Sequence, residues 1–312
     1  MRVLITGGCG YKGSVLVPKI ANNHEVTVLD TCWFGRDIPL DVKLIVGDIR
    51  EDRPLPYDAI IHLAGIANDP CGELDAKLTW EVNVLATMRM CERAVRDGVK
   101  QFIYASSASV YGVKDQDQIT EDLPLEPVSD YNKTKMVAER VLLSYQDKMI
   151  VQIVRPATVC GVSPRMRLDT MVNTLTMQAL KGGNITAHCG EHGGDLMRPN
   201  IHIEDITDLY AWLLERPGLE GVYNAGFENI SALNTAKLIA EEIPANIIIT
   251  KVKDKRSYKI NSDKLLKEGF YPKFTVRDAI KDIVQAYKLG EIHDTDNAYN
   301  LRWMTQQGLV RV

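Results

Sequence analysis

The sequence contains no long uninterrupted hydrophobic run, no paired-cysteine motif and no excess of basic residues. No segment approaches the ~18 consecutive apolar residues that a membrane-spanning helix needs, and the apolar run near the first residue is too short for an export signal. The 6 cysteines are scattered without a Cys-x-x-Cys pair, which is typical of reduced thiols rather than of a disulfide framework. We therefore expect a cytoplasmic protein with no part in a membrane.

The charge balance is mildly acidic. With 37 Lys and Arg against 41 Asp and Glu, the chain has a formal net charge of −4 at pH 7. A nucleic-acid surface needs concentrated Lys and Arg, so we expect no nucleic-acid partner, although local arginines can still bind phosphate. The 312 residues suffice for one large and one smaller domain, because domains hold roughly 100–200 residues each.

Short apolar runs alternate with longer mixed segments through the first half of the chain. Helical patterns over residues 78–98 and 132–143 fall between several of these runs. Alternation of this kind predicts an α/β fold with a Rossmann-type, doubly wound parallel sheet. The runs expected to form its buried strands are residues 3–5, 25–29, 43–46, 59–63, 101–105 and 151–154.

The pattern changes after Arg155 and Pro156, where Pro and Gly pairs break the chain into loops. Helices are expected there over residues 170–180, 234–242 and 275–289. We predict a larger dinucleotide-binding domain over residues 1–160. A smaller C-terminal α/β domain over residues 161–312 would be mainly substrate-binding, with elements free to return to the first domain.

A glycine-rich loop, TGGCGYKG, occupies residues 6–13 between the first expected strand and a helix. Read from Gly8 it matches G-x-G-x-x-G, and read from Gly7 it matches the wider G-x-x-G-x-x-G. Such glycines let the backbone approach a pyrophosphate that rests on a helix N-terminus. Since the flanking strand and helix are what the motif requires, we predict a dinucleotide site here. Its expected contacts are Gly7, Gly10, Tyr11, Lys12 and Gly13.

Asp30 ends the second expected strand, 20 residues after Gly10. A carboxylate at that place accepts hydrogen bonds from the adenosine ribose hydroxyls and repels a 2′-phosphate. The sequence therefore predicts NAD rather than NADP. The alternative is that Asp30 only starts a turn.

Two further segments carry polar side chains suited to hydride chemistry. Ser107 lies at the end of the strand over residues 101–105, and Tyr131 and Lys135 stand four apart on one face of a helix. An unperturbed tyrosine has a pKa near ~10, so we expect the ammonium of Lys135 and a positive nicotinamide ring to lower it. Ser107 would orient a substrate hydroxyl whose proton Tyr131 accepts. Although Tyr-x-x-x-Lys alone occurs by chance in many helices, three motifs in order favour the catalytic interpretation.

In this order, the motifs resemble those of an extended short-chain dehydrogenase/reductase of the NAD-dependent epimerase/dehydratase family. The resemblance covers nearly the whole chain and includes Gly47-Asp48-Ile49, His62-Leu63-Ala64-Gly65, Asn83-Val84 and Arg155-Pro156. It implies a nucleotide-sugar substrate between two domains and a homodimer. It also implies that Asp48 contacts the adenine and that Asn83 supports the site from its helix. The remaining cofactor contacts implied by the resemblance are Ile49, Leu63, Ala64, Gly65, Ser106 and Pro156.

On the substrate side, the segment around Arg198 resembles the family segment whose arginine holds the sugar-nucleotide pyrophosphate. Thr158 stands where sugar epimerases often place a substrate-binding asparagine. Lys251, Asp254 and Arg256 compete for the role of a late arginine, of which Arg256 is the candidate taken here.

The segment Ser163–Asp169 resembles a branch of the family that acts on bacterial surface sugars. Its Arg165 and Arg167 could steer an anionic substrate, and a solvated or dimer-contact role is an equal alternative. His188–His192 has metal-ligand residue types but no second ligand group, so we expect an exposed loop and no metal.

The chain departs from sugar dehydratases of the family at Ala108 and Ser109, where those enzymes usually carry an Asp-Glu pair. This departure disfavours dehydration. We expect a NAD-dependent nucleotide-sugar epimerase that oxidises and reduces C4 through a keto sugar. Net oxidation or reduction of such a sugar remains the alternative, followed by a non-catalytic NAD-sensing protein. A steroid or flavonoid reductase would prefer NADP and would not carry Asp30.

Asp30 generates the first testable prediction. NAD should bind at least about tenfold more tightly than NADP, because the carboxylate repels the 2′-phosphate. Calorimetric titration with each dinucleotide measures the ratio. Equal affinities would show that Asp30 does not face the ribose.

Overall fold

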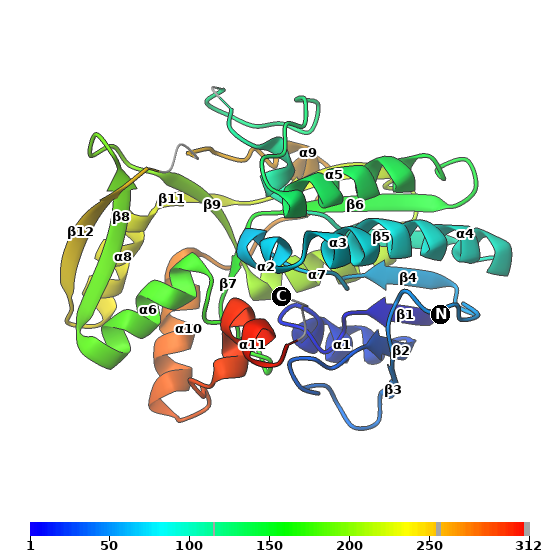
Figure 1. Cartoon of the computed structure of the whole chain (residues 1–312), viewed down its shortest axis with the longest axis horizontal. Helices are drawn as coiled ribbons and strands as arrows, with labels where there is room; N and C mark the ends of the chain where they lie inside the picture. The colour runs from blue at the N-terminus through cyan, green and yellow to red at the C-terminus, as the bar shows by residue number, and fades with distance from the viewer. Residues whose placement is uncertain (115, 254–256, 309–312) are drawn as a thin grey trace.

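The computed structural model describes residues 1–114, 116–253 and 257–308 of the chain (Figure 1). Its centre is a seven-stranded sheet in which every pairing is parallel. The order of the strands reverses between β1 and β4, and such a reversal opens a ligand crevice at the carboxyl ends of the strands. This sheet confirms the predicted Rossmann-type fold. In spatial order its strands are β10 (Gly221–Ala225), β6 (Ile150–Pro156), β5 (Gln101–Ala105), β4 (Ala59–His62), β1 (Arg2–Thr6), β2 (Glu25–Asp30) and β3 (Lys43–Val46).

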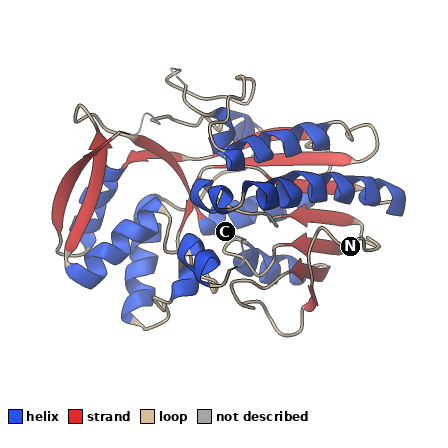
Figure 2. Cartoon of the chain, viewed as in Figure 1, coloured by secondary structure: helices blue, strands red, loops and turns tan. Residues whose placement is uncertain are grey.

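Helices cover both faces of the sheet (Figure 2). On one face, α1 (Gly13–Ala21) packs against α7 (Ile203–Leu214), and on the other α4 (Thr87–Asp97) packs against α5 (Asp130–Leu143). Because β1 has apolar residues at successive positions, it contributes Val3 and Ile5 to one core and Leu4 to the other. Burial on both faces explains why the strands read as continuous hydrophobic runs.

The helix expected over residues 78–98 forms as three consecutive pieces. It begins as α3 (Ala76–Trp80), widens into a π-helical turn over Glu81–Ala86 and continues as α4. The widened turn contains Asn83, whose side chain is buried. Local π-helical turns of this kind are frequent at functional sites.

The chain beyond residue 160 contributes to both parts of the molecule. The strand β10 pairs with β6, and α7 packs on α1, so this half of the chain returns two elements to the central sheet. The division into domains at residue 160 stays a prediction. The other elements of this half are β7 (Thr158–Cys160), α6 (Met171–Gly182), β8 (Asn184–Gly190), β9 (Met197–His202), β11 (Glu228–Ser231), α8 (Ala232–Glu242), β12 (Asn246–Val252), α9 (Asp263–Lys267), α10 (Val276–Lys288), a 3-10 turn (Asp296–Ala298) and α11 (Asn300–Gln306).

The expectation of a loop at His188 is wrong. His188 and Cys189 lie in β8, which pairs with β12 in a separate two-stranded parallel sheet. Ile185, Ala187 and Cys189 are buried at alternating positions, as in a strand with one covered face. Across the described ranges, no helix combines the length and apolar character that crossing a membrane requires.

A buried ion pair fixes α5 to the sheet. The Nη2 atom of Arg155, on β6, lies 2.7 Å from Oε2 of Glu139, on α5, and the two side chains are 5% and 1% exposed. Glu139 also accepts a hydrogen bond from the hydroxyl of Ser106, directly after β5. Arg155 donates to the hydroxyl of Tyr111 at 2.6 Å. One charge pair therefore joins β6, α5 and the segment that follows β5.

Removing one member of this pair leaves the other charge buried without its partner. Glu139→Ala should lower the free energy of unfolding by about 3–5 kcal/mol, measured by urea titration. Glu241→Ala is the matched control, because Glu241 pairs with Arg277 at the surface, where such pairs contribute at most about 1 kcal/mol. Equal losses in the two variants would contradict this account of the buried pair.

Candidate active site

A cavity of about 830 Å³ lies between the carboxyl ends of the central strands and the second half of the chain. It is large enough for a dinucleotide and a second ligand to share, since small-molecule sites occupy roughly 300–1,000 Å³. Asn83 lies outside its wall, and Arg256 lies outside the described residues. The expected site residues that line it are Gly7, Gly10, Tyr11, Lys12, Gly13, Asp30, Asp48, Ile49, Leu63, Ala64, Gly65, Ser106, Ser107, Tyr131, Lys135, Pro156, Thr158 and Arg198.

The glycine loop is folded tightly enough to exclude side chains at two of its positions. Gly7 has a φ of +72°, and a Cβ atom there would lie 2.6 Å from the backbone nitrogen of Ala64. A Cβ on Gly13 would lie 2.5 Å from the carbonyl oxygen of Gly7. The helix α1 starts at Gly13 with no side-chain cap and no acidic residue in its first turn. Because Gly13 lines the cavity, the N-terminus of α1 adjoins it, and helix N-termini favour anions such as a dinucleotide pyrophosphate.

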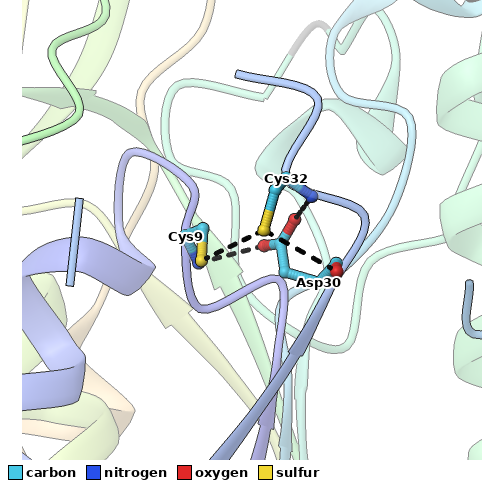
Figure 3. A group of neighbouring side chains, drawn as sticks. All are labelled: Cys9, Asp30 and Cys32. Atoms are coloured by element: carbon cyan, nitrogen blue, oxygen red, sulfur yellow. Dashed lines mark hydrogen bonds between the residues drawn. The ribbon is translucent and has the colours of Figure 1, made fainter. Parts of the chain in front are cut away.

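Asp30 links this loop to the end of β2 (Figure 3). Its Oδ2 atom accepts a hydrogen bond from the amide of Cys9 at 2.9 Å, and Oδ1 accepts one from the amide of Cys32 at 2.8 Å. Burial raises the pKa of Asp30, and these two bonds oppose that rise. Each carboxylate oxygen can accept a further hydrogen bond, so capacity remains for a ribose hydroxyl.

The thiols of Cys9 and Cys32 lie 3.9 Å apart beside the same carboxylate (Figure 3). Together with Asp30 they form a cluster of ligand-type atoms within 4.8 Å of one another. Burial raises the pKa of both thiols, which favours the protonated form over a metal-binding thiolate. The expectation of no metal stays a prediction.

The residues expected to flank the dinucleotide are held by specific polar contacts. Asp48 accepts from the guanidinium of Arg50 at 2.8 Å, which lowers the pKa of Asp48 and keeps it ionised. Asn83 accepts from the amide of Ile66 at 2.8 Å and donates to the hydroxyl of Thr134 at 3.1 Å. A Cβ on Gly65 would lie 2.8 Å from Oδ1 of Asn83. Asn83 therefore positions the loop after β4 against α5.

Ser107 and Tyr131 meet at the cavity wall. The Ser107 hydroxyl lies 2.7 Å from that of Ser109, and a hydrogen bond with Ser107 opposes the rise in the pKa of Tyr131. The hydroxyl of Ser129 caps α5 by accepting from the amide of Asn132 at 3.2 Å. This cap starts the helix one residue before Tyr131 and so fixes the direction of its ring.

Lys135 is 95% buried one helical turn after Tyr131, since its exposed fraction is 5%. Its ammonium donates to the carbonyl oxygen of Ala105 at 2.8 Å and lies 4.8 Å from the centre of the Tyr104 ring. Burial, with added repulsion from Lys12, lowers the pKa of Lys135 to about 7.

The expectation that Lys135 and a bound nicotinamide ring lower the pKa of Tyr131 stays a prediction. Burial raises the pKa of Tyr131, and the charged group that counteracts burial is Arg167. Desolvation of the partly buried phenol outweighs the groups that oppose it, of which the hydrogen bond with Ser107 has the largest effect. Ionisation of Tyr131 therefore requires additional positive charge in the cavity, such as that of a bound nicotinamide ring.

Thr158 and Arg198 lie on the adjacent strands β7 and β9. Arg198 donates to the carbonyl oxygen of Met197 at 3.0 Å. Both residues line the cavity, so the structure brings the expected substrate-binding pair to the same space as Tyr131.

The lining residues that were not predicted as site residues include Trp33, Phe34, Arg165, Arg167 and Asn300. The two arginines had a sequence signal in the segment Ser163–Asp169. Asn300 had none, because its place at the cavity depends on how the end of the chain packs.

The chain is similar to several characterised proteins. The model of the NAD dependent epimerase/dehydratase family matches residues 3–226. UDP-glucose 4-epimerase of Corynebacterium glutamicum is 27% identical, over 90% of this chain and 94% of that protein. UDP-glucuronic acid decarboxylase 1 of Danio rerio is 27% identical, over 96% of this chain and 75% of that protein. The structure of UDP-glucose 4-epimerase from Thermus thermophilus, complexed with NAD, superposes with a TM-score of 0.79, at 25% identity over 92% of this chain and 100% of that one.

Arg167 generates a prediction about pH. Its positive charge favours the Tyr131 phenolate, so Arg167→Gln should raise the pKa of Tyr131. The pH at which hydride transfer reaches half its maximal rate should therefore move upward in the variant, measured with saturating dinucleotide and sugar nucleotide. Arg302→Gln, which removes a surface charge paired with Asp296, should leave that pH unchanged. A downward move in Arg167→Gln would contradict the role given to Arg167.

Proposed function

The chain belongs to the NAD-dependent epimerase/dehydratase family, and from this premise we propose that it is a nucleotide-sugar epimerase. The proposed reaction oxidises the sugar at C4 to a transient ketone and reduces it again from the other face. The observation that carries the proposal is the meeting of Ser107, Tyr131 and Lys135 at a cavity that Arg198 also lines. At Ala108 and Ser109 no carboxylic acid is available to expel water from a neighbouring carbon, which disfavours dehydration.

Each catalytic side chain has a defined task. Tyr131 accepts the proton of the sugar hydroxyl at its phenolic oxygen and returns it when the ketone is reduced. Ser107, already within hydrogen-bonding reach of Tyr131, orients the same hydroxyl. Lys135 donates to the carbonyl oxygen of Ala105 at the end of β5, and anions bound in the cavity would favour its charged form beside the phenol. Bound NAD supplies the ring that takes and returns the hydride.

The cofactor would be held by the residues 1–160, through the glycine loop, Asp30, Asp48 and the loop after β4. The nucleotide sugar would be held mainly by the residues 161–312, through Thr158 at the boundary and through Arg198. A charge-assisted bond from Arg198 to the pyrophosphate of the sugar nucleotide fits its place in the wall of the cavity that Tyr131 also lines. From the same family premise we propose a homodimer that works in the cytoplasm.

Tyr131→Phe removes only the group that accepts the proton. The rate of epimerisation should fall by about 10²–10⁴-fold, while the NAD content of the purified protein stays unchanged. Product formation from a panel of nucleotide sugars is followed by chromatography, with Tyr145→Phe as the control for losing a phenol elsewhere. Accumulation of free NADH with wild-type protein would support net dehydrogenation instead. A variant as fast as the wild type would refute the mechanism.

A further inference from the structure

Arg165 is a buried cation without a counter-ion. Its exposed fraction is 4%, and its Nε atom has no hydrogen-bond partner. The two groups that its Nη2 atom contacts are neutral: the carbonyl oxygen of Asn297 at 3.3 Å and Oδ1 of Asn300 at 2.6 Å. Among the described residues, no carboxylate lies within ion-pair distance of it. Because burying an unpaired charge costs several kcal/mol, such a site calls for an anion.

The place of Arg165 identifies which anion it would meet. The amide of Arg165 donates to the hydroxyl of Ser14 in the first turn of α1 at 3.3 Å. The hydroxyl of Ser163 donates to the carbonyl oxygen of Tyr11 in the glycine loop at 2.8 Å. The guanidinium lies 4.2 Å from the centre of the Phe34 ring, which follows β2. Arg165 is thus attached to the uncapped start of α1, where the glycine loop would place the dinucleotide pyrophosphate.

The local charge balance matches that ligand. Lys12, Arg165 and Arg167 all line this part of the cavity, and Asp169 pairs with Arg167 alone, at 2.6 Å. Asp30 and Asp37 act on Arg165 only from beyond ion-pair distance, so among the described residues Lys12 and Arg165 have no direct ion pair, and the pyrophosphate of a dinucleotide carries one negative charge on each phosphate. Burial and repulsion from Arg167 lower the pKa of Lys12 to about 8 and that of Arg165 to about 10, so an anion here would relieve both.

The end of the chain holds Arg165 in place. The amide of Asn300 donates to Asp169 at 2.9 Å, in addition to the contact of its side chain with Arg165. The indole of Trp303 donates to the carbonyl oxygen of Trp33 at 2.5 Å. Figure 1 shows α11, in red, near α2 (Asp69–Leu74), and the two helices are in contact. The C-terminal segment, defined here as residues 296–306, therefore covers the cofactor side of the cavity.

We propose that Arg165 binds the pyrophosphate of the dinucleotide beside the glycine loop, and that the C-terminal segment holds it there through Asn300. The cofactor would then stay bound from one turnover to the next. This inference deepens the proposed function, because an epimerase must return the hydride to the sugar it came from and gains nothing from exchanging its cofactor.

The first test measures the release of NAD from loaded protein into an excess of isotopically labelled NAD. Arg165→Gln should release NAD at least about tenfold faster than wild type, since a charge-assisted hydrogen bond is lost. Arg277→Gln, a surface arginine on α10 paired with Glu241, should release it at the wild-type rate. Unchanged release from folded Arg165→Gln would overturn the proposal.

The second arm separates the two pyrophosphates that the cavity could hold. The affinity of NAD-loaded protein for UDP should be unchanged in Arg165→Gln and at least about tenfold weaker in Arg198→Ala. Weaker UDP binding in Arg165→Gln with normal NAD release would assign Arg165 to the sugar nucleotide and overturn the proposal. Both arms measure binding and not turnover. They therefore test the role of Arg165 separately from the proposed epimerase activity.

Asn300→Asp tests the role of charge without removing Arg165. The substituted carboxylate would stand where Oδ1 of Asn300 lies 2.6 Å from Nη2 of Arg165, and so would supply the missing counter-ion. We expect the protein stripped of NAD to melt at a higher temperature and to bind NAD at least about tenfold more weakly. A purely structural role for Asn300 would move stability and NAD binding in the same direction, which would contradict the proposal.

Discussion

The ion pair of Arg155 and Glu139 holds together the elements on which the site depends. Glu139 lies on α5 four residues after Lys135, and it also accepts a hydrogen bond from Ser106, next to Ser107. The charge pair thus sets the distance between the helix that carries Tyr131 and the strand end that carries Ser107. A buried pair contributes little net stability, but it is costly to break and therefore specifies one arrangement. Here that arrangement brings the phenol of Tyr131 and the hydroxyl of Ser107 together at the carboxyl end of the parallel sheet.

Above this pair, the site is dominated by cations that the fold keeps from water. Lys12, Lys135, Arg165 and Arg167 line one cavity, and burial lowers the pKa of the first three. Burial also raises the pKa of Tyr131, so the protein alone disfavours the phenolate. Anions entering at the glycine loop would restore the charge on the lysines, and a positive ring beside Tyr131 would favour its ionisation. The charges of bound ligands would therefore balance the buried cations and favour the ionised form of Tyr131.

Much of the central sheet could be predicted from the sequence, because strands buried on both faces form continuous apolar runs. Local sequence patterns predicted the glycine loop, Asp30 and the pair of Tyr131 and Lys135. The structure places all of these features in the cavity wall. The strand at His188 was missed, since its alternation of buried and exposed residues is short and flanked by glycines. Asn300 and the pKa of Tyr131 could not be predicted, because both follow from packing between segments far apart in the chain. The burial of Arg165 likewise depends on the packing of the whole chain and could not be predicted from the segment Ser163–Asp169.

We expect the sugar to give up a hydride and to receive the same one back within the cavity. This expectation is tested by incubating the protein with a nucleotide sugar that carries deuterium at C4, in ordinary water with excess unlabelled NAD. The account predicts epimerised product that keeps its deuterium at C4, with no deuterium in the free dinucleotide pool. Loss of deuterium from the product, or its appearance in free NADH, would contradict the account.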